Sequence, residues 1–181
     1  MRVITGSARG RKLVTPDGME VRPTLDKVKE GLFSAIQFEI EGRDVLDLFA
    51  GSGQLGVEAL SRGASSCVFV DSSKKSVHAV TTNVSACGFQ NQSKVLTGDA
   101  LSYIKSCMQT FGIVFLDPPY GMKWIDKVLP FVVDHVEQGG IIVCESDLKE
   151  ELPEECGDFC VDRVRNYSHT KVTIYRRKQS E

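Results

Sequence analysis

Residues 44–56 read DVLDLFAGSGQLG, and this stretch decides the fold. A short apolar run typical of a buried strand is followed by a glycine-rich turn and then by a helical pattern. Glycines in such a turn let the backbone approach a ligand closely, and the start of the next helix favours negative charge such as a carboxylate. In an open α/β sheet, ligands bind at the carboxyl edge of the strands. The stretch therefore predicts a nucleotide-type binding loop at that edge.

The acidic residues around this loop separate two kinds of cofactor. Gly51, Gly53 and Gly56 match the G-x-G-x-x-G pattern of dinucleotide sites. Asp71 follows at about the expected distance, but an acid there can bind the ribose of any adenosine cofactor. Asp47 would repel a pyrophosphate, whereas it would attract a sulfonium and an ammonium group. The loop therefore favours S-adenosylmethionine over a dinucleotide.

Asp99 and Ala100 follow the third expected strand, again at the carboxyl edge. A short acidic side chain in this place can accept a hydrogen bond from the adenine amino group. Asp99 can also cap the helix that begins after it, and the two roles are compatible.

The second informative stretch is Ile113–Tyr120, which reads IVFLDPPY. An apolar strand delivers Asp117, Pro118, Pro119 and Tyr120 to the same sheet edge. Because prolines lack amide donors, the Pro118 carbonyl can remain a free acceptor beside the Asp117 carboxylate. Two such acceptors can hold the hydrogens of a base amino group for in-line attack on a sulfonium methyl group, while Tyr120 stacks on the base. The two motifs together predict methyl transfer to an exocyclic amine, with no metal ion required.

The rest of the chain alternates short apolar runs with helical stretches, which is the signature of parallel β-α-β units. The expected strands are 44–48, 67–71, 94–97, 112–117, 140–145, 159–166 and 170–177, and the expected helices are 24–37, 54–62, 73–87, 100–108 and 124–136. The last two strands, joined by a short polar connection, are typical of an antiparallel hairpin. We predict an α/β fold with a mostly parallel seven-stranded sheet that ends in this hairpin.

Charge is distributed unevenly along the chain. Residues 1–30 carry seven Lys or Arg against four acids, and residues 163–178 carry six with no acid, around an acidic middle. The basic ends are either solvated charge or a split footprint for phosphates. Residues 1–23, marked by glycine, arginine and proline, are expected to form a basic extension ahead of a main domain at 24–181.

Length and composition exclude several classes. A chain of 181 residues with 41% hydrophobic content fits one domain with a sizeable core. The N-terminal stretch lacks the apolar region of a secretory signal, and no apolar run is long enough to span a bilayer. The six cysteines lack the paired spacing of a zinc site. We expect a cytoplasmic monomer that holds no metal and contacts no membrane.

These residues resemble the ribosomal small-subunit methyltransferase D family, whose members methylate the guanine N2 of 16S rRNA. The likeness covers essentially the whole chain. It rests on residues 9–13 (RGRKL), 22–24 (RPT), 28–30 (VKE), 47–53 (DLFAGSG), 58–64 (EALSRGA), 117–120 (DPPY) and 144–146 (CES). The early motifs matter most, since the later ones are shared across many methyltransferases.

The resemblance implies a Rossmann-like methyltransferase fold with a small N-terminal β-hairpin, S-adenosylmethionine as donor, and a target guanine in 16S rRNA of the small ribosomal subunit or its assembly intermediate. By matching position, Asp47, Gly51 and Gly53 would line the methionine end of the cofactor. Asp71 would bind the ribose, and Asp99 and Ala100 would bind the adenine. Asp117 to Tyr120 would bind the target base. RNA contacts would come from Arg9, Arg11, Lys12 and Arg22. The net charge of −2 is lower than the family leads us to expect, which fits a substrate presented by a ribosomal particle.

Other functions stay open. The same chemistry could act on adenine N6 or cytosine N4 in DNA, or on a protein glutamine amide. An Asp rather than an Asn at the start of the DPPY motif counts against glutamine, and the chain has no room for a DNA target-recognition segment. A catalytically silent RNA-binding assembly factor is a further alternative, although the intact motif residues count against it. An NAD-dependent oxidoreductase leaves DPPY unexplained.

Overall fold

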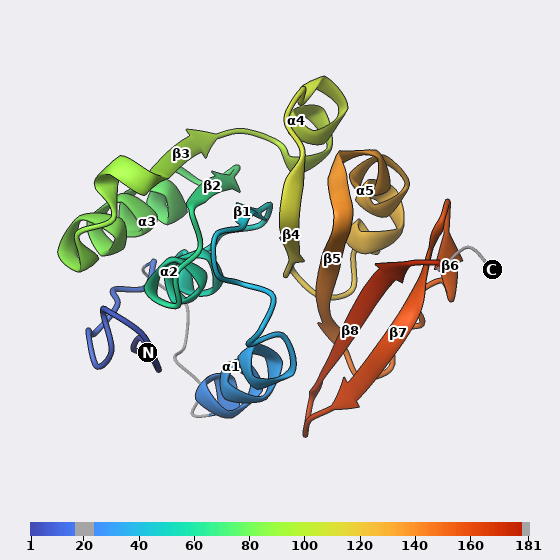
Figure 1. The fold of residues 1–181 in the computed structure, drawn as a ribbon, viewed down its shortest axis with the longest axis horizontal. Coiled ribbons are helices and arrows are strands. Elements are labelled where there is room, and N and C mark those ends of the chain that lie inside the picture. The colour runs from blue at the N-terminus through green and yellow to red at the C-terminus, as the bar shows by residue number, and fades with distance from the viewer. Residues whose placement is uncertain (17–23, 179–181) are drawn as a thin grey trace.

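The computed structural model describes residues 1–16 and 24–178. Within them, helices and strands alternate as drawn in Figure 1. The helices are α1 (Thr24–Ala35), α2 (Gln54–Ser61), α3 (Lys74–Cys87), α4 (Ala100–Ser106) and α5 (Trp124–Val132), with short 3-10 turns η1 (Gln90–Gln92) and η2 (Val133–His135). The strands are β1 (Asp44–Asp47), β2 (Ser66–Asp71), β3 (Ser93–Thr97), β4 (Phe111–Leu116), β5 (Val136–Asp147), β6 (Glu155–Cys156), β7 (Phe159–Asn166) and β8 (Thr170–Arg177).

These strands form a single sheet in the order β3-β2-β1-β4-β5-β8-β7-β6. The pairs among β1 to β5 are parallel, so the carboxyl ends of these strands share one edge. β8 runs antiparallel to β5 and pairs with β7 to make the C-terminal hairpin. This arrangement confirms the predicted Rossmann-like fold class, with a mostly parallel sheet and an antiparallel end.

Helices cover both faces of the sheet (Figure 1). Side chains of α1, α2 and α3 pack with Val45 of β1 in one hydrophobic cluster. Side chains of α4 and α5 pack with the next residue, Leu46, in a second cluster. Because successive strand side chains point to opposite faces, the two clusters lie on opposite sides of the sheet.

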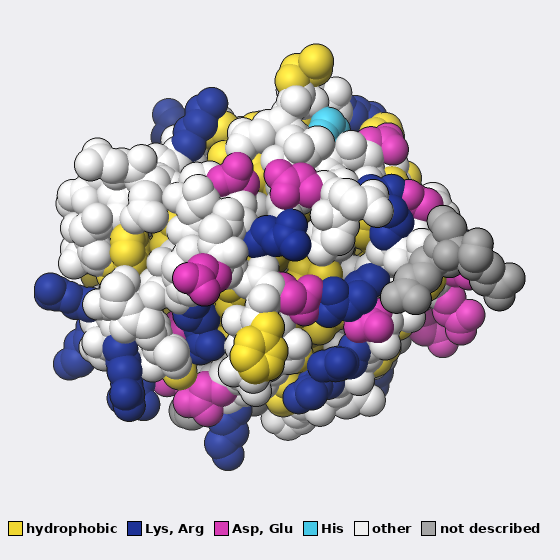
Figure 2. Space-filling view, in the orientation of Figure 1, with side chains coloured by type: hydrophobic (Ala, Val, Ile, Leu, Met, Phe, Trp, Pro, Cys, Tyr) yellow, Lys and Arg dark blue, Asp and Glu magenta, His cyan; other side chains and the backbone are white. Residues whose placement is uncertain are grey.

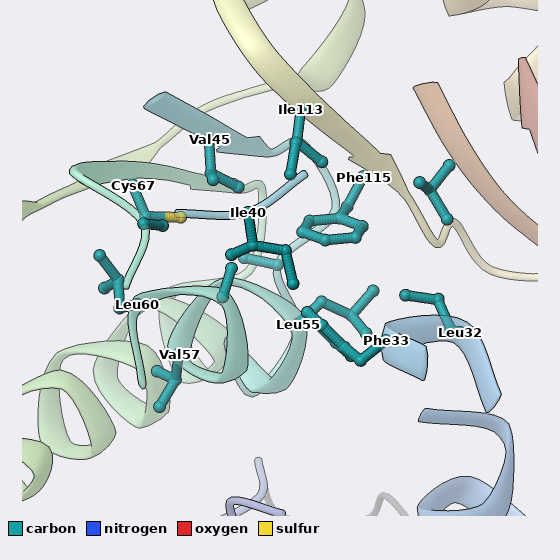
Figure 3. Close-up of a cluster of buried hydrophobic side chains, with 14 of the residues drawn as sticks. Leu32, Phe33, Ile40, Val45, Leu55, Val57, Leu60, Cys67, Ile113 and Phe115 are labelled. Atoms are coloured by element: carbon teal, nitrogen blue, oxygen red, sulfur yellow. The ribbon is translucent and has the colours of Figure 1, made fainter. Parts of the chain in front are cut away.

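The first cluster ties α1 to the centre of the sheet. Figure 3 shows Phe33 of α1 close to Phe115 of β4, with Ile40 and Leu55 beside them. The two phenyl rings have centroids 5.7 Å apart and are tilted by 48°. Burial of each such side chain contributes roughly 1.5–3 kcal/mol. The cluster therefore fixes α1 and α2 beneath the loop that follows β1.

The N-terminal residues 1–16 lie against α2 and α3 and are joined to them by buried polar contacts. The carboxylate of Glu58 accepts hydrogen bonds from the backbone N–H groups of Ile4 and Thr5 at 2.8 and 3.0 Å. It also lies 3.3 Å from the ammonium group of Lys29 and accepts from Arg62 Nε at 2.9 Å. Lys29 and Glu58 are 2% and 0% exposed, so this network belongs to the interior of the molecule.

The predicted N-terminal hairpin is present as one antiparallel bridge between Arg2 and Lys12. Apolar residues on both of its arms join the first hydrophobic cluster: they are Val3, Ala8 and Leu13. At its turn, Gly6 has a φ of 88°, and a Cβ there would lie 1.7 Å from the carbonyl oxygen of Ser61. Only glycine fits this close approach of the hairpin to α2. The division of the chain at residues 23 and 24 stays a prediction.

Three elements differ most from the sequence expectation. β5 spans Val136–Asp147 rather than residues 140–145, so it begins at the expected end of the preceding helix. The strand β6, only two residues long, makes the sheet eight-stranded rather than seven-stranded. So short a run carries no alternation that a sequence could reveal. α5 ends at Val132 instead of residue 136 and continues as η2. Pro130 stands inside α5, where its missing N–H removes one hydrogen bond of the helix.

No helix in the described ranges is long and apolar enough to cross a membrane. Among residues 1–16 and 24–178, no group of three or more His, Cys, Asp or Glu side chains is placed to hold a metal ion. All six cysteines are free thiols.

Candidate active site

A cavity of about 540 Å³ opens at the carboxyl ends of β1, β2, β3 and β4. Its lining comes from the loops after these strands and from the beginnings of α3, α4 and α5. One side carries Gly51, Asp71, Asp99 and Ala100, which are four of the six predicted cofactor residues. The other side carries the whole Asp117–Tyr120 segment. The two sequence motifs thus face a common space, as parallel strands require.

Asp71 organises the glycine-rich loop. Its Oδ2 accepts from the backbone N–H of Gly51 at 2.8 Å, and its Oδ1 accepts from that of Ser73 at 2.8 Å. Gly51 needs its glycine because it has a φ of 56°. An ionised carboxylate has about four acceptor positions, so Asp71 can still bind hydroxyl groups in the cavity.

Asp47 lies beneath the cavity and does not line it. The side chain is 1% exposed, and its Oδ2 accepts from the backbone N–H of Gly56 at 3.0 Å. Oδ1 is also buried and has no partner in the described part of the chain. Burial raises the pKa of Asp47 to about 7; nearby Asp71 also raises it, while the bond from Gly56 lowers it. A buried carboxyl group with a free oxygen calls for a donor or a positive charge.

Gly53 also lies outside the cavity lining, where it shapes the loop. It precedes α2 with a φ of 75°, and a Cβ there would lie 3.2 Å from Val80 and 3.3 Å from Phe69. The conformation and the close packing both favour glycine.

Asp99 caps α4 and lines the cavity at the same time. Its Oδ1 accepts from the backbone N–H and from the hydroxyl of Ser102, both at 2.8 Å. These bonds lower the pKa of Asp99. The expected helix cap is present, and its position leaves the second carboxylate oxygen available for a ligand.

The DPPY wall contains a carboxyl group with a raised pKa. Burial raises the pKa of Asp117 well above its usual value, and the neighbouring carboxyls of Glu145 and Asp47 raise it further. The hydroxyl of Tyr120 lies 2.9 Å from Thr170 Oγ1 and donates to Glu145 Oε1 at 3.4 Å. The Tyr120 ring remains 40% exposed at the cavity, as a stacking surface must be.

Sequence reasoning missed several residues at the site. Trp124 begins α5, lines the cavity and lies beside Phe49, with ring centroids 6.0 Å apart. Ser76 of α3 is a further lining residue that no motif singled out. Glu145, buried near the end of β5, does not line the cavity but contacts Tyr120; it belongs to the 144–146 motif, to which sequence reasoning gave no role. An acid at the carboxyl end of an apolar strand was the signal available for Glu145.

The basic residues predicted to contact RNA lie apart from the cavity. Arg9, Arg11 and Lys12 are exposed on the N-terminal hairpin. In Figure 2, Lys and Arg side chains gather along the lower left of the view, over the region where Figure 1 places the N-terminal segment. Arg22 lies outside the described residues.

A family model described as conserved hypothetical protein 95 matches residues 1–176. The chain belongs to this family, the small-subunit methyltransferase D family. YlbH of Bacillus subtilis is 40% identical over 98% of this chain and 100% of its own length. The Escherichia coli K12 family member named ribosomal RNA small subunit methyltransferase D is 30% identical over 98% of this chain and 90% of its own length.

A solved structure with related sequence has the same fold. The protein yhhF of Escherichia coli superposes with a TM-score of 0.88 at 30% identity and covers 98% of each chain. The fold and the family together support methyltransferase activity, and the cavity is the candidate for its site.

Proposed function

We propose that this protein transfers a methyl group from S-adenosylmethionine to the exocyclic N2 of a guanine in the 16S rRNA of the small ribosomal subunit. The observation that carries the proposal is the shared cavity: Asp117 and Tyr120 face Asp71 and Asp99 across one space. A site for an adenosine cofactor and a site for a base amine therefore adjoin. The named activity of the Escherichia coli relative supports ribosomal RNA as the substrate.

The residues present fit a cationic cofactor. Oδ1 of Asp47 is buried without a partner in residues 1–16 and 24–178, and the pKa of this carboxyl is raised to about 7 by burial. A nearby ammonium or sulfonium group would stabilise its ionised form. We expect Asp47, beneath the glycine-rich loop, to attract the positively charged methionine end of the cofactor. Gly51 and Gly53 would shape that loop. Asp71 would hold the ribose hydroxyls, and Asp99 and Ala100 the adenine.

S-adenosylmethionine supplies an electrophilic methyl group when it is bound. The protein's own part is to present the amine. The Asp117 carboxylate and the Pro118 carbonyl accept the two amino hydrogens, which turns the nitrogen lone pair toward the methyl group. When the N–C bond formed, the bond between the methyl carbon and the cofactor sulfur would break; the nitrogen would then lose one proton, and Asp117 is placed to accept it. Its raised pKa makes it a stronger base than an ordinary aspartate.

Tyr120 and the basic hairpin would place the substrate. Stacking on the exposed Tyr120 ring orients a flipped-out base. Arg9, Arg11 and Lys12 would contact RNA phosphates outside the cavity. Because Val3 and Leu13 anchor the hairpin in the core, these cations are held on a fixed surface. Arg22 is proposed to join them on the strength of the resemblance alone.

The first test is methyl transfer from labelled S-adenosylmethionine to naked 16S rRNA, isolated small subunits and duplex DNA in parallel. Nucleoside analysis of the labelled product then identifies the base. N2-methylguanosine from small subunits is the expected result. Label in DNA would move the function to a DNA methyltransferase, and cofactor binding without any transfer would favour a silent assembly factor.

A further inference from the structure

Three carboxyl groups stand in a row at the edge of the sheet. Asp47 ends β1, Asp117 follows β4, and Glu145 lies near the end of β5, which are three neighbouring strands. The pairing of Leu116 with Cys144 places Asp117 beside Glu145. Because side chains alternate along a strand, each acid lies on the same face as the residue two positions before it. Those residues, Val45, Phe115 and Val143, all belong to the first hydrophobic cluster, so the three acids share one face.

Glu145 is buried, and its one side-chain hydrogen bond within the described ranges is long. The residue is 5% exposed, and its recorded hydrogen bond is the long contact of 3.4 Å from Tyr120. No Lys, Arg or His side chain forms an ion pair with it in the described ranges of the chain. Burial raises its pKa to about 7. Its charge in turn raises the pKa of Asp117. Two adjacent acids without cations form a site for hydrogen-bond donors.

The arrangement of donors on a base edge distinguishes guanine from the other amino-bearing bases. Guanine presents N1–H next to the N2 amino group, so it offers adjacent donors. Adenine and cytosine carry an unprotonated ring nitrogen next to their amino groups, and that lone pair would face a carboxylate. A buried acceptor left without its donor is costly, so such a site rejects the wrong base strongly.

We propose that Glu145 selects guanine by accepting the hydrogen bond of ring N1–H while Asp117 holds the N2 amino group. The inference rests on the proposed function, because it concerns the base that enters that site. Tyr120 closes the arrangement: its hydroxyl donates to the Glu145 carboxylate while its ring stacks on the base. Glu145 is then a direct base contact that the sequence motifs did not assign.

The test uses small subunits reconstituted with 16S rRNA that carries either guanosine or 2-aminopurine riboside at the nucleotide mapped in the first assay. Both bases have the 2-amino group, but in 2-aminopurine the ring N1 is an acceptor. We expect wild-type protein to methylate guanosine about tenfold to a hundredfold faster under single turnover. In Glu145→Gln, whose amide can donate to ring N1, the guanosine rate should fall by a similar factor and the preference should shrink toward one.

Thr170→Val is the matched control. It removes a partner of the Tyr120 hydroxyl and leaves Glu145 in place, so the ratio of the two rates should stay at the wild-type value. An unchanged ratio in Glu145→Gln overturns the proposal. The proposal is also overturned if the ratio of the two rates falls as far in Thr170→Val as in Glu145→Gln, since Glu145 would then act only through Tyr120.

Wild-type protein alone also provides a test that needs no variant: equal rates on the two bases overturn the proposal. A different outcome would overturn the proposed function: wild-type protein would then label no guanosine at all. Cofactor affinity, measured by calorimetry, should be the same in wild-type and Glu145→Gln protein.

Discussion

The carboxylate of Glu58 lies 3.3 Å from the ammonium group of Lys29, and both side chains are buried. The same carboxylate accepts the N–H groups of Ile4 and Thr5, so one anion joins α1, α2 and the N-terminal segment. Glu58→Ala should lower the free energy of unfolding by about 3–5 kcal/mol, because Lys29 would be left buried and unpaired. Chemical denaturation of the two proteins measures the difference.

A surface pair provides the control for this prediction. Glu137 lies 3.7 Å from Arg43, and both side chains are partly exposed. Glu137→Ala should change the free energy of unfolding by less than about 1 kcal/mol. An equally small effect of Glu58→Ala would show that the buried network does not stabilise the fold.

Asp47 should make the free protein less stable at high pH. Burial raises its pKa from 3.8 to about 7, so between these values the folded chain binds a proton that the unfolded chain has released. The stability linked to this group is therefore lost as pH rises through that window. Asp47→Asn should raise the free energy of unfolding at pH 8 by roughly 1–4 kcal/mol and have little effect near pH 4. Thermal unfolding across this pH range is the measurement.

The same substitution should weaken cofactor binding. An asparagine keeps an acceptor for the Gly56 N–H but loses the charge that would attract a sulfonium or ammonium group. We expect the Kd for S-adenosylmethionine to rise about tenfold to a hundredfold by calorimetry. Asp134→Asn, at an exposed site in η2, should leave the Kd unchanged. If Asp47→Asn bound the cofactor normally, Asp47 would have only a structural role.

Asp117→Ala should separate chemistry from cofactor binding. The side chain contacts the target amine in the proposed function, so turnover should fall by at least about a hundredfold while the cofactor Kd changes little. Single-turnover methyl transfer and calorimetry together measure the two effects. Asp126→Ala, at an exposed position of α5, serves as the control and should keep normal turnover. A large loss of cofactor affinity in Asp117→Ala would contradict the assigned role.

Arg9 and Arg11 should contribute to RNA binding through phosphates. Reversing both charges to Glu should weaken substrate binding and make its logarithmic dependence on salt less steep. The control reverses two other exposed cations, Lys94 of β3 and Lys105 of α4. A filter-binding titration over a range of salt concentrations checks both pairs. An unchanged slope in the Arg9 and Arg11 variant would remove the hairpin from the RNA footprint.

The cavity was predictable because its motifs are local. Each motif is a contiguous run after an apolar strand, and parallel strands bring such runs to one edge. Asp71 and Asp117 could therefore be placed together from the sequence, although 46 positions separate them. How deeply a side chain is buried could not be predicted from the sequence in the same way. Asp47 lies beneath the cavity because its carboxylate turns inward to the Gly56 N–H.

The contacts that escaped prediction are long-range. Tyr120 meets Thr170, 50 positions away, because β8 inserts between β5 and β7 and brings its first residue to the active edge. Glu58 meets Thr5 across 53 positions, through a turn that only Gly6 can make. Neither pair leaves a periodic pattern in the sequence. Both depend on how whole elements dock.

The position of β8 has a consequence for how the protein is made. This strand, near the C-terminal end of the chain, pairs with β5 on one side and β7 on the other. Until it has been synthesised, β5 exposes an unpaired edge, and Tyr120 lacks its Thr170 partner. During translation, β1 to β4 and the helices around them can therefore fold first. The base-binding segment Asp117 to Tyr120 can be completed only after β8 has been made. A nascent chain stalled before Thr170 should be prone to aggregate and should carry no methyltransferase activity.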